Sequence, residues 1–230
     1  GAVLVEDACH ALGAERNGVK VGLEADMTVL SFHPVKHVTT GEGGMVLTKS
    51  TEFAEKLRLF RSHGITKDPA MMARNPEGPW YTEMLELGYN YRLSDIQCAL
   101  GISQMKRLDA SIARRREIAA RYDNAFRGND AIAIPPGHPG HAYHLYPVWI
   151  SPELRKRVFE GLRDAGIGVQ VHYLPVPLHP YYRRVFGYKP GGFPNAEKIY
   201  SGEISLPMYP DLDDADVSRV IHEVLLLVGA

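Results

Sequence analysis

The chain has 230 residues, of which 45% are hydrophobic and 23% charged, so it can form one large domain or two small ones around apolar cores. Its 26 basic and 27 acidic side chains nearly balance, which leaves no positive field to hold nucleic acid or anionic lipid. We therefore expect a small-molecule partner, and no apolar run reaches the roughly 20 residues that span a bilayer. Cys9 and Cys98 are too few for a disulfide framework and match no zinc spacing, so buried thiols in a reducing cytoplasm are expected.

The first ninety residues predict a sheet, a helix and a long flap. Apolar runs at residues 2–5, 27–32 and 44–48 alternate with glycine-bearing turns, which is typical of strands. The first run has the composition of a buried parallel strand with neighbours on both sides, so we expect a further segment of the sheet to precede this chain. Apolar residues at helical spacing predict a covering helix over residues 51–63. Residues 64–91 are irregular and rich in proline, and they predict a functional or mobile flap.

The remainder of the chain predicts a helical bridge and a small mixed domain. Ser94 is a suitable N-cap for helical spacing that continues to residue 126, as two helices or one long bent helix. Four more elements are predicted, namely strands over residues 141–150 and 167–173 and helices over residues 152–165 and 213–228. We therefore expect an α/β domain over residues 1–108 and a small α+β domain over residues 109–230.

Two predicted strand ends carry the residues with the most informative chemistry. Lys36 follows the strand at residues 27–32, and glycines follow at 41–44, so its amine can enter a cleft that the backbone approaches closely. Asp7 follows the first strand, at the edge where open α/β sheets bind ligands. Pyridoxal phosphate needs such a pair, because a lysine holds its aldehyde and a carboxylate keeps its ring nitrogen protonated. Taken singly, Lys36 could be a surface lysine and Asp7 a helix N-cap.

Four segments in this order resemble the DegT/DnrJ/EryC1/StrS sugar aminotransferases: DACHALGA at 7–14, SFHPVK at 31–36, GEGG at 41–44 and GYNYRLSDIQ at 88–97. The resemblance covers the whole chain. It implies an α/β PLP-dependent transferase fold (fold type I, aspartate aminotransferase-like), with residues 1–108 as the remainder of the large PLP-binding domain and 109–230 as the small α+β domain. The family's amino-terminal part has no counterpart here, so we expect a split, a truncation or a segment of a longer polypeptide.

The resemblance also implies roles at the matching positions. Lys36 would attach pyridoxal 5'-phosphate and act as the base and acid of the 1,3-proton shift. Asp7 would bind the pyridinium nitrogen, His10 would lie against the ring or its phenolic oxygen, and Ser31 would bind the phosphate. Asn90 would reach the phosphate from the partner subunit of a homodimer with a shared active site. From the residues alone, His10 could instead be a packing histidine and Asn90 a turn residue in the left-handed conformation.

Within the family, HYLPVP at 172–177 and SLP at 205–207 most resemble the transaminases of pseudaminic acid synthesis. This likeness implies that glutamate donates an amino group to the C4 keto group of a UDP-linked 4-keto-6-deoxy sugar. It also makes Arg92, His172 and Tyr173 candidates to bind the nucleotide sugar. Sugars linked to dTDP or GDP are alternatives.

The sequence also has other interpretations. A family relative that dehydrates deoxysugars has histidine in place of the attaching lysine, and Lys36 argues against it. A chain without the amino-terminal part could also act only as a subunit or interaction module. His138, His141 and His144 have no matching acidic or cysteine cluster, so we expect no metal. The basic run at 114–116 predicts a solvated helix face or a subunit contact.

Overall fold

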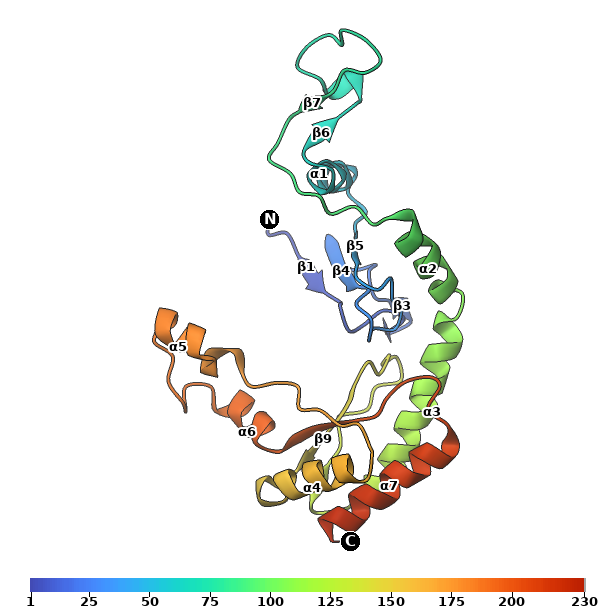
Figure 1. Cartoon of the computed structure of the whole chain (residues 1–230), viewed down its shortest axis with the longest axis vertical. Helices are drawn as coiled ribbons and strands as arrows, with labels where there is room; N and C mark the ends of the chain where they lie inside the picture. Colours follow the sequence, from blue (N-terminus) through green and yellow to red (C-terminus); the bar gives the residue numbers. More distant parts are fainter. Residues whose placement is uncertain (230) are drawn as a thin grey trace. The chain divides into compact units, whose positions relative to one another are not determined.

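The computed structural model describes residues 1–229, which divide into two compact units at Leu108 and Asp109 (Figure 1). In the first unit, β1 (Val5–Asp7), β4 (Met27–Ser31) and β5 (Gly44–Leu47) form a sheet in the order β1-β4-β5. β1 is parallel and β5 antiparallel to β4. The three predicted strands therefore form, and the parallel pair places the carboxyl ends of β1 and β4 at the same edge of the sheet.

β1 is exposed among the described residues, so they alone do not bury the first predicted strand. Val3, Leu4 and Val5 are each more than half exposed. Within residues 1–229, β4 is the only strand that pairs with β1. The apolar composition predicts the strand correctly, but burial depends on neighbours that the described residues do not supply.

α1 (Thr51–Arg61) begins at Ser50, whose hydroxyl accepts a hydrogen bond of 3.2 Å from the backbone N–H of Phe53. The predicted helix is present. None of its residues is fully buried, however, and Phe60 is exposed. The prediction that α1 covers a sheet is therefore not met by the described residues.

Two short antiparallel hairpins complete the strands of this unit. One pairs β2 (Glu15–Arg16) with β3 (Val19–Lys20), and the other pairs β6 (Ile65–Thr66) with β7 (Glu83–Met84). The second hairpin and the 3-10 turn η1 (Pro69–Met71) lie within the segment predicted as an irregular flap. That segment is thus partly regular, because its backbone pairs with itself.

α2 (Asp95–Met105) begins at the predicted cap. The hydroxyl of Ser94 accepts a hydrogen bond from the backbone N–H of Gln97, and the Gln97 side chain accepts one from the backbone N–H of Ser94 (2.9 Å). This reciprocal capping box fixes the start of the helix. α3 (Leu108–Phe126) follows as a second helix. Cys98 on α2 is exposed, which corrects the expectation of a buried thiol.

The second unit is built on an antiparallel sheet with the strand order β10-β9-β8. Its strands are β8 (Ile132–Ala133), β9 (Tyr146–Ile150) and β10 (Glu203–Leu206). β9 forms only the end of the strand predicted over residues 141–150. The strand predicted over residues 167–173 is reduced to one bridge between Gln170 and Ser205, so this prediction is wrong. β10 occupies the position beside β9 and was not predicted from the sequence.

Three helices supply the core of this unit, namely α3, α4 (Pro152–Asp164) and α7 (Asp214–Val228). The helices predicted over residues 152–165 and 213–228 are confirmed as α4 and α7. Asp213 caps α7 by accepting a 2.7 Å hydrogen bond from the backbone N–H of Asp216. Tyr122 of α3, Leu162 of α4 and Val217 of α7 are fully buried in the same cluster. No helix within residues 1–229 is both long and apolar enough to cross a membrane.

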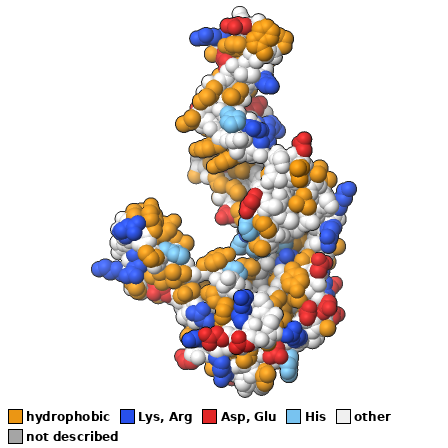
Figure 2. Space-filling view, in the orientation of Figure 1, with side chains coloured by type: hydrophobic (Ala, Val, Ile, Leu, Met, Phe, Trp, Pro, Cys, Tyr) orange, Lys and Arg blue, Asp and Glu red, His pale blue; other side chains and the backbone are white. Residues whose placement is uncertain are grey.

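Two helices of this unit, α5 (Pro180–Phe186) and α6 (Pro194–Gly202), were not predicted. Hydrophobic and basic side chains gather over α5 (Figure 2). The rings of Tyr182, Phe186 and Tyr188 stack in series at centroid distances of 5.8 Å. No residue of α5 is buried, so α5 contributes nothing to the core.

Arg115 corrects the prediction of a solvated basic run on α3. It is only 4% exposed, because it shares the inward face of the helix with Ile112 and Ile118. Its Nη1 donates to three backbone carbonyls, those of Tyr143 (3.0 Å), His144 (3.3 Å) and Met208 (2.7 Å). Burial lowers the pKa of Arg115 to about 10, so the group is still a cation at neutral pH.

Replacing Arg115 with alanine is expected to lower the free energy of unfolding by about 3 kcal/mol, because three buried carbonyls lose their shared donor. Arg163→Ala is a matched control, since Arg163 is exposed near the end of α4, and it should change the unfolding free energy by less than about 0.5 kcal/mol. Urea denaturation of the two variants measures the difference. Equal midpoints would contradict the structural role of Arg115.

Candidate active site

Two neighbouring strand ends form the framework of the candidate site. Asp7 is the last residue of β1 and Ser31 the last residue of β4. The backbone N–H of Ala8 donates to the carbonyl of Val29 (2.9 Å), which continues the parallel pairing just beyond Asp7. The pairing therefore brings Asp7 and Ser31 to the same edge of the sheet, as predicted.

The carboxylate of Asp7 begins a tight turn. Its Oδ1 accepts a 3.1 Å hydrogen bond from the backbone N–H of Cys9, and no helix follows, so Asp7 is not a helix N-cap. Hydrogen bonding from Cys9, aided by the positive charges of His10 and Lys36, lowers the pKa of Asp7 below its ordinary value. Asp7 thus presents an exposed, ionised carboxylate at neutral pH.

Lys36 lies in the turn that follows β4. The turn begins with a 3.4 Å hydrogen bond from the backbone N–H of His33 to the hydroxyl of Ser31, and the backbone N–H of Lys36 donates to the carbonyl of His33 (3.0 Å). Lys36 is half-buried, and desolvation lowers its pKa, although the negative charge of Asp7 acts in the opposite direction. A lowered pKa increases the fraction of neutral amine at a given pH, which is the form that attacks a carbonyl.

His10 and Cys9 flank this pair. His10 is exposed among the described residues, and it lowers the pKa of Asp7. Cys9 is half-buried rather than buried, and burial together with Asp7 raises its pKa, which keeps the thiol protonated at neutral pH. Asp7, His10 and Lys36 therefore form one electrostatic group.

Gly43 and Gly44 of the glycine-rich segment have a packing role within the chain. A Cβ on Gly44 would lie 2.8 Å from the carbonyl oxygen of Leu30, and one on Gly43 would lie 2.8 Å from a methyl carbon of Leu93. The carbonyl of Glu42 accepts a 2.8 Å hydrogen bond from a side-chain amide of α2. Close backbone packing alone accounts for these two glycines, without a ligand.

Asn90 and Arg92 lie on the segment that leads into α2, and both are exposed. Asn90 forms a bridge with Ser62, and its neighbour Tyr89 donates its backbone N–H to the carbonyl of Phe60 at the end of α1 (2.7 Å). These contacts hold Asn90 beside α1 and do not bring it to Asp7 or Ser31. Asn90 does not have a positive φ, so it is not a left-handed turn residue.

His172 and Tyr173 belong to the second unit. Nδ1 of His172 lies 2.8 Å from the hydroxyl of Ser205, and its backbone N–H donates to Oε2 of Glu203 (2.7 Å). Tyr173 is 71% exposed, with its ring edge-on to that of His172. Glu203 was not predicted as a partner of His172, although SLP at 205–207 overlaps β10, the strand that carries both Glu203 and Ser205.

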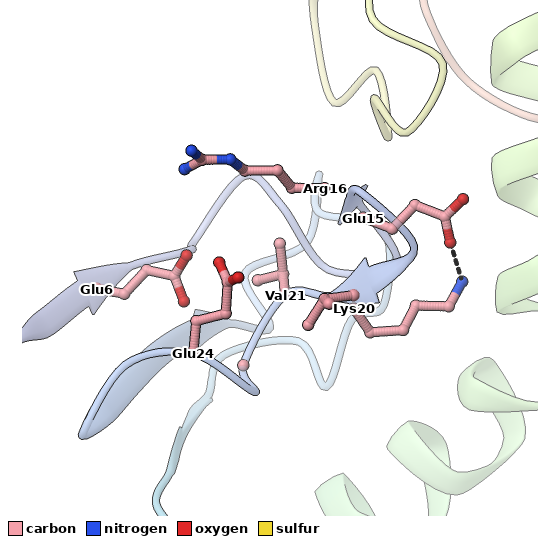
Figure 3. Close-up of a pocket in the computed structure, with 8 residues that line it drawn as sticks. Glu6, Glu15, Arg16, Lys20, Val21 and Glu24 are labelled. Atoms are coloured by element: carbon pink, nitrogen blue, oxygen red, sulfur yellow. Dashed lines mark ion pairs between the residues drawn. The ribbon is translucent and has the colours of Figure 1, made fainter.

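A separate pocket lies beside the β2–β3 hairpin (Figure 3). Lys20 forms an ion pair with Glu15 there (3.3 Å), and Glu6 and Glu24 also line the pocket. None of the predicted site residues lines it. Its lining has three glutamates against two basic side chains, Arg16 and Lys20, so it has no net positive charge to hold an anionic phosphate.

His138 and His141, two of the three histidines spaced three residues apart, have local structural partners. Nδ1 of His138 accepts a hydrogen bond from the backbone N–H of Gly140 (3.0 Å), and Nδ1 of His141 accepts one from that of Tyr143 (2.8 Å). Among residues 1–229, no group of three or more His, Cys, Asp or Glu side chains is arranged to hold a metal ion.

The chain is similar to curated proteins along almost its whole length. It is 46% identical to an uncharacterized protein of Methanocaldococcus jannaschii over 98% of the chain and 60% of that protein. It is 42% identical to the UDP-4-amino-4,6-dideoxy-N-acetyl-beta-L-altrosamine transaminase of Campylobacter jejuni over 94% of the chain and 56% of that enzyme. The chain therefore spans less than two thirds of the length of either relative.

Solved structures of sugar aminotransferases have the same fold. The Helicobacter pylori aminotransferase PseC of pseudaminic acid biosynthesis matches with a TM-score of 0.89 and 36% identity, over 98% of this chain and 59% of that one. A sugar aminotransferase candidate from Streptococcus pneumoniae, solved in its PLP form, matches with a TM-score of 0.87 and 30% identity, over 98% of this chain and 57% of that one. These neighbours confirm the prediction of fold type I. The DegT/DnrJ/EryC1/StrS aminotransferase family model matches residues 1–225, so the chain belongs to this family.

Proposed function

We propose that the protein carrying this chain is a PLP-dependent aminotransferase that moves an amino group from glutamate to the C4 keto group of a UDP-linked 4-keto-6-deoxy sugar. The observation that carries this proposal is the placement of Asp7 at the end of β1 and of Lys36 in the turn after the neighbouring parallel strand β4, at the same edge of the sheet. The name of the Campylobacter relative supports an amino-sugar nucleotide as the product. Sugars linked to dTDP or GDP are the alternative substrates.

The residues fit pyridoxal phosphate in charge and chemistry. Asp7 is an ionised carboxylate that can hold a proton on the ring nitrogen, and the hydroxyl of Ser31 is a neutral donor for a phosphate. His10 adds an imidazole beside Asp7. When bound, pyridoxal phosphate supplies a ring that withdraws electrons from the carbon that loses a proton.

Lys36 is assigned two tasks. Its amine attaches the cofactor in the resting enzyme, for which the neutral form is required. In the first half of the reaction Nζ would accept the proton from Cα of glutamate and pass it to the bound cofactor, and in the second half it would take that proton back and deliver it to C4 of the sugar. A pKa lowered by desolvation favours the first transfer because the amine can accept a proton near neutral pH.

Arg92, His172 and Tyr173 are assigned to the nucleotide sugar. Arg92 is an exposed cation, which suits a diphosphate. The exposed phenol of Tyr173 can bind a hydroxyl group or stack on a ring. Both free cysteines suit the reducing cytoplasm in which we place the reaction.

A half-reaction assay tests the function. The purified holoenzyme with glutamate alone should release one 2-oxoglutarate per active site, and a UDP-linked 4-keto-6-deoxy sugar should then yield the 4-amino sugar, as measured by mass spectrometry. The same assay with dTDP- and GDP-linked sugars ranks the nucleotides. A protein that takes up no cofactor and releases no 2-oxoglutarate would support the interaction-module alternative.

We also propose a homodimer in which Asn90 reaches the partner's cofactor phosphate. Asn90 is exposed at the end of a long segment, which is a suitable place to cross a two-fold interface. A ligand held by both subunits favours the dimer by its differential affinity.

Asn90→Ala should therefore raise the dissociation constant of the cofactor roughly tenfold, since one hydrogen bond to a charged group is lost. The dimer should also dissociate more readily, most strongly without pyridoxal phosphate. Sedimentation with and without cofactor measures both effects, and Asn75→Ala in the same exposed segment is the control. A monomer with full cofactor affinity would rule out the shared site.

A further inference from the structure

A buried carboxylate in the second unit has no part in the function proposed above. Glu203, the first residue of β10, is 4% exposed. Its Oε1 accepts a 2.6 Å hydrogen bond from the hydroxyl of Ser205, and its Oε2 accepts one of 2.7 Å from the backbone N–H of His172. Burial of a carboxylate is costly unless its oxygens are hydrogen-bonded, and these two bonds supply that compensation.

The hydroxyl of Ser205 links this carboxylate to an imidazole ring. It lies 2.6 Å from Oε1 of Glu203 and 2.8 Å from Nδ1 of His172. A serine hydroxyl has one proton to donate, and the ionised carboxylate can only accept. The serine proton therefore goes to Glu203, so the bond between Ser205 and His172 requires a proton on Nδ1 of the ring.

We propose that Glu203 and Ser205 are positioning residues that hold neutral His172 as its Nδ1–H tautomer. The remaining ring nitrogen, Nε2, then has the lone pair and acts as a hydrogen-bond acceptor. His172 is half-buried, so part of its surface is accessible to a ligand. Building on the proposed function, we assign Nε2 to accept a hydrogen bond from a hydroxyl group of the nucleotide-linked sugar.

The segment that carries His172 is docked on the same strand. The backbone N–H of Ser205 donates to the carbonyl of Gln170 (2.8 Å), and Tyr173 packs edge-on against His172. A purely structural Glu203 would do no more than hold this segment on β10. Such a role predicts a change in stability on mutation, but no change of tautomer.

Glu203→Gln distinguishes the two roles because it preserves the shape of the side chain. The glutamine oxygen can still accept from the backbone N–H of His172, which leaves its NH₂ group facing Ser205. The amide then donates to the serine hydroxyl, the hydroxyl donates to Nδ1, and the ring proton moves to Nε2. The substitution is thus expected to invert the tautomer while retaining every contact.

The ¹⁵N NMR spectrum of histidine-labelled full chain at pH 9 reports the tautomer directly, since protonated and unprotonated ring nitrogens have distinct shifts. His172→Gln assigns the resonances. We expect Nδ1–H in the parent chain and in Glu197→Gln, a control in which an exposed carboxylate bonded to backbone N–H groups is replaced. Nε2–H in the parent, or an unchanged tautomer in Glu203→Gln, would overturn the proposal. If Glu203→Gln does not fold, Ser205→Ala serves instead and should abolish the preference for Nδ1–H.

Kinetics of the holoenzyme test the assignment to the sugar. Glu203→Gln should raise KM for the nucleotide sugar about tenfold, because a donor replaces an acceptor, and should leave the glutamate half-reaction unchanged. An inverted tautomer with unchanged KM would overturn the sugar contact. Failure of the proposed function itself would differ, since the parent enzyme would then release no 2-oxoglutarate.

Discussion

Replacing Lys36 with alanine is expected to abolish transamination and leave the fold nearly intact. The amine is proposed both to attach the cofactor and to carry out the proton transfer of each half-reaction, so its loss removes two functions at once. We expect kcat to fall by a factor on the order of 10³ or more. Lys36 lies half-buried in a turn, and truncating a side chain of this kind costs little packing energy.

Borohydride reduction followed by peptide mass spectrometry locates the attachment site. A pyridoxyl group should be found on Lys36 in the parent protein and be absent from Lys36→Ala. Lys56→Ala is the matched control, because Lys56 is an exposed lysine paired with Glu52 on α1 and should retain both the adduct and activity. An adduct on any other lysine would refute the assignment of Lys36.

Elements with strong local signals were predicted well from the sequence. α2 and α7 begin at capping side chains, Ser94 and Asp213, that are recognisable by their spacing to the following backbone. β4 was predicted within one residue of its end, because a short apolar run bounded by turns favours a strand. These signals depend on residues that are close together in the sequence.

Burial and strand pairing were predicted less well, because they depend on residues far apart in the chain. Arg115 looks like a surface cation, yet it donates to Met208, 93 residues away. The apolar residues at 167–173 have a strand's composition, but β10 pairs with β9 and leaves that segment a single bridge. The composition of residues 167–173 favours an extended backbone, but it does not identify the strand with which that backbone pairs.

The residues of the candidate site also differ in how well the sequence predicts their positions. Asp7 and Ser31 end strands and Lys36 lies in the turn after one, so the order of the strands predicts that they meet at one edge of the sheet. Glu203 bonds to His172 across 31 residues, and a glutamate in a short strand carries no local signal of burial. Its pairing could be recognised only after β10 and the segment at 170–172 were placed together.

Replacing Asp7 with asparagine is expected to reduce kcat by a factor on the order of 10² to 10³ and to weaken cofactor binding much less. The asparagine oxygen can still accept the hydrogen bond from the backbone N–H of Cys9, so the turn is preserved. Only the negative charge is lost, and with it the proton on the ring nitrogen that the charge would hold. Spectroscopic titration with pyridoxal phosphate gives the affinity, and steady-state kinetics give kcat.

Asp26→Asn is the control for the loss of the negative charge at Asp7. Asp26 is also an exposed carboxylate of the first unit, and its Oδ2 accepts a 2.8 Å hydrogen bond from the backbone N–H of Leu4, but it is not assigned to the site. Its amide variant should retain the parent kcat, since an asparagine oxygen can make the same bond. If kcat is also unchanged in Asp7→Asn, the carboxylate of Asp7 has only a structural role in its turn. If kcat falls only in Asp7→Asn and the cofactor is still bound, the cause is the loss of the negative charge beside the ring nitrogen.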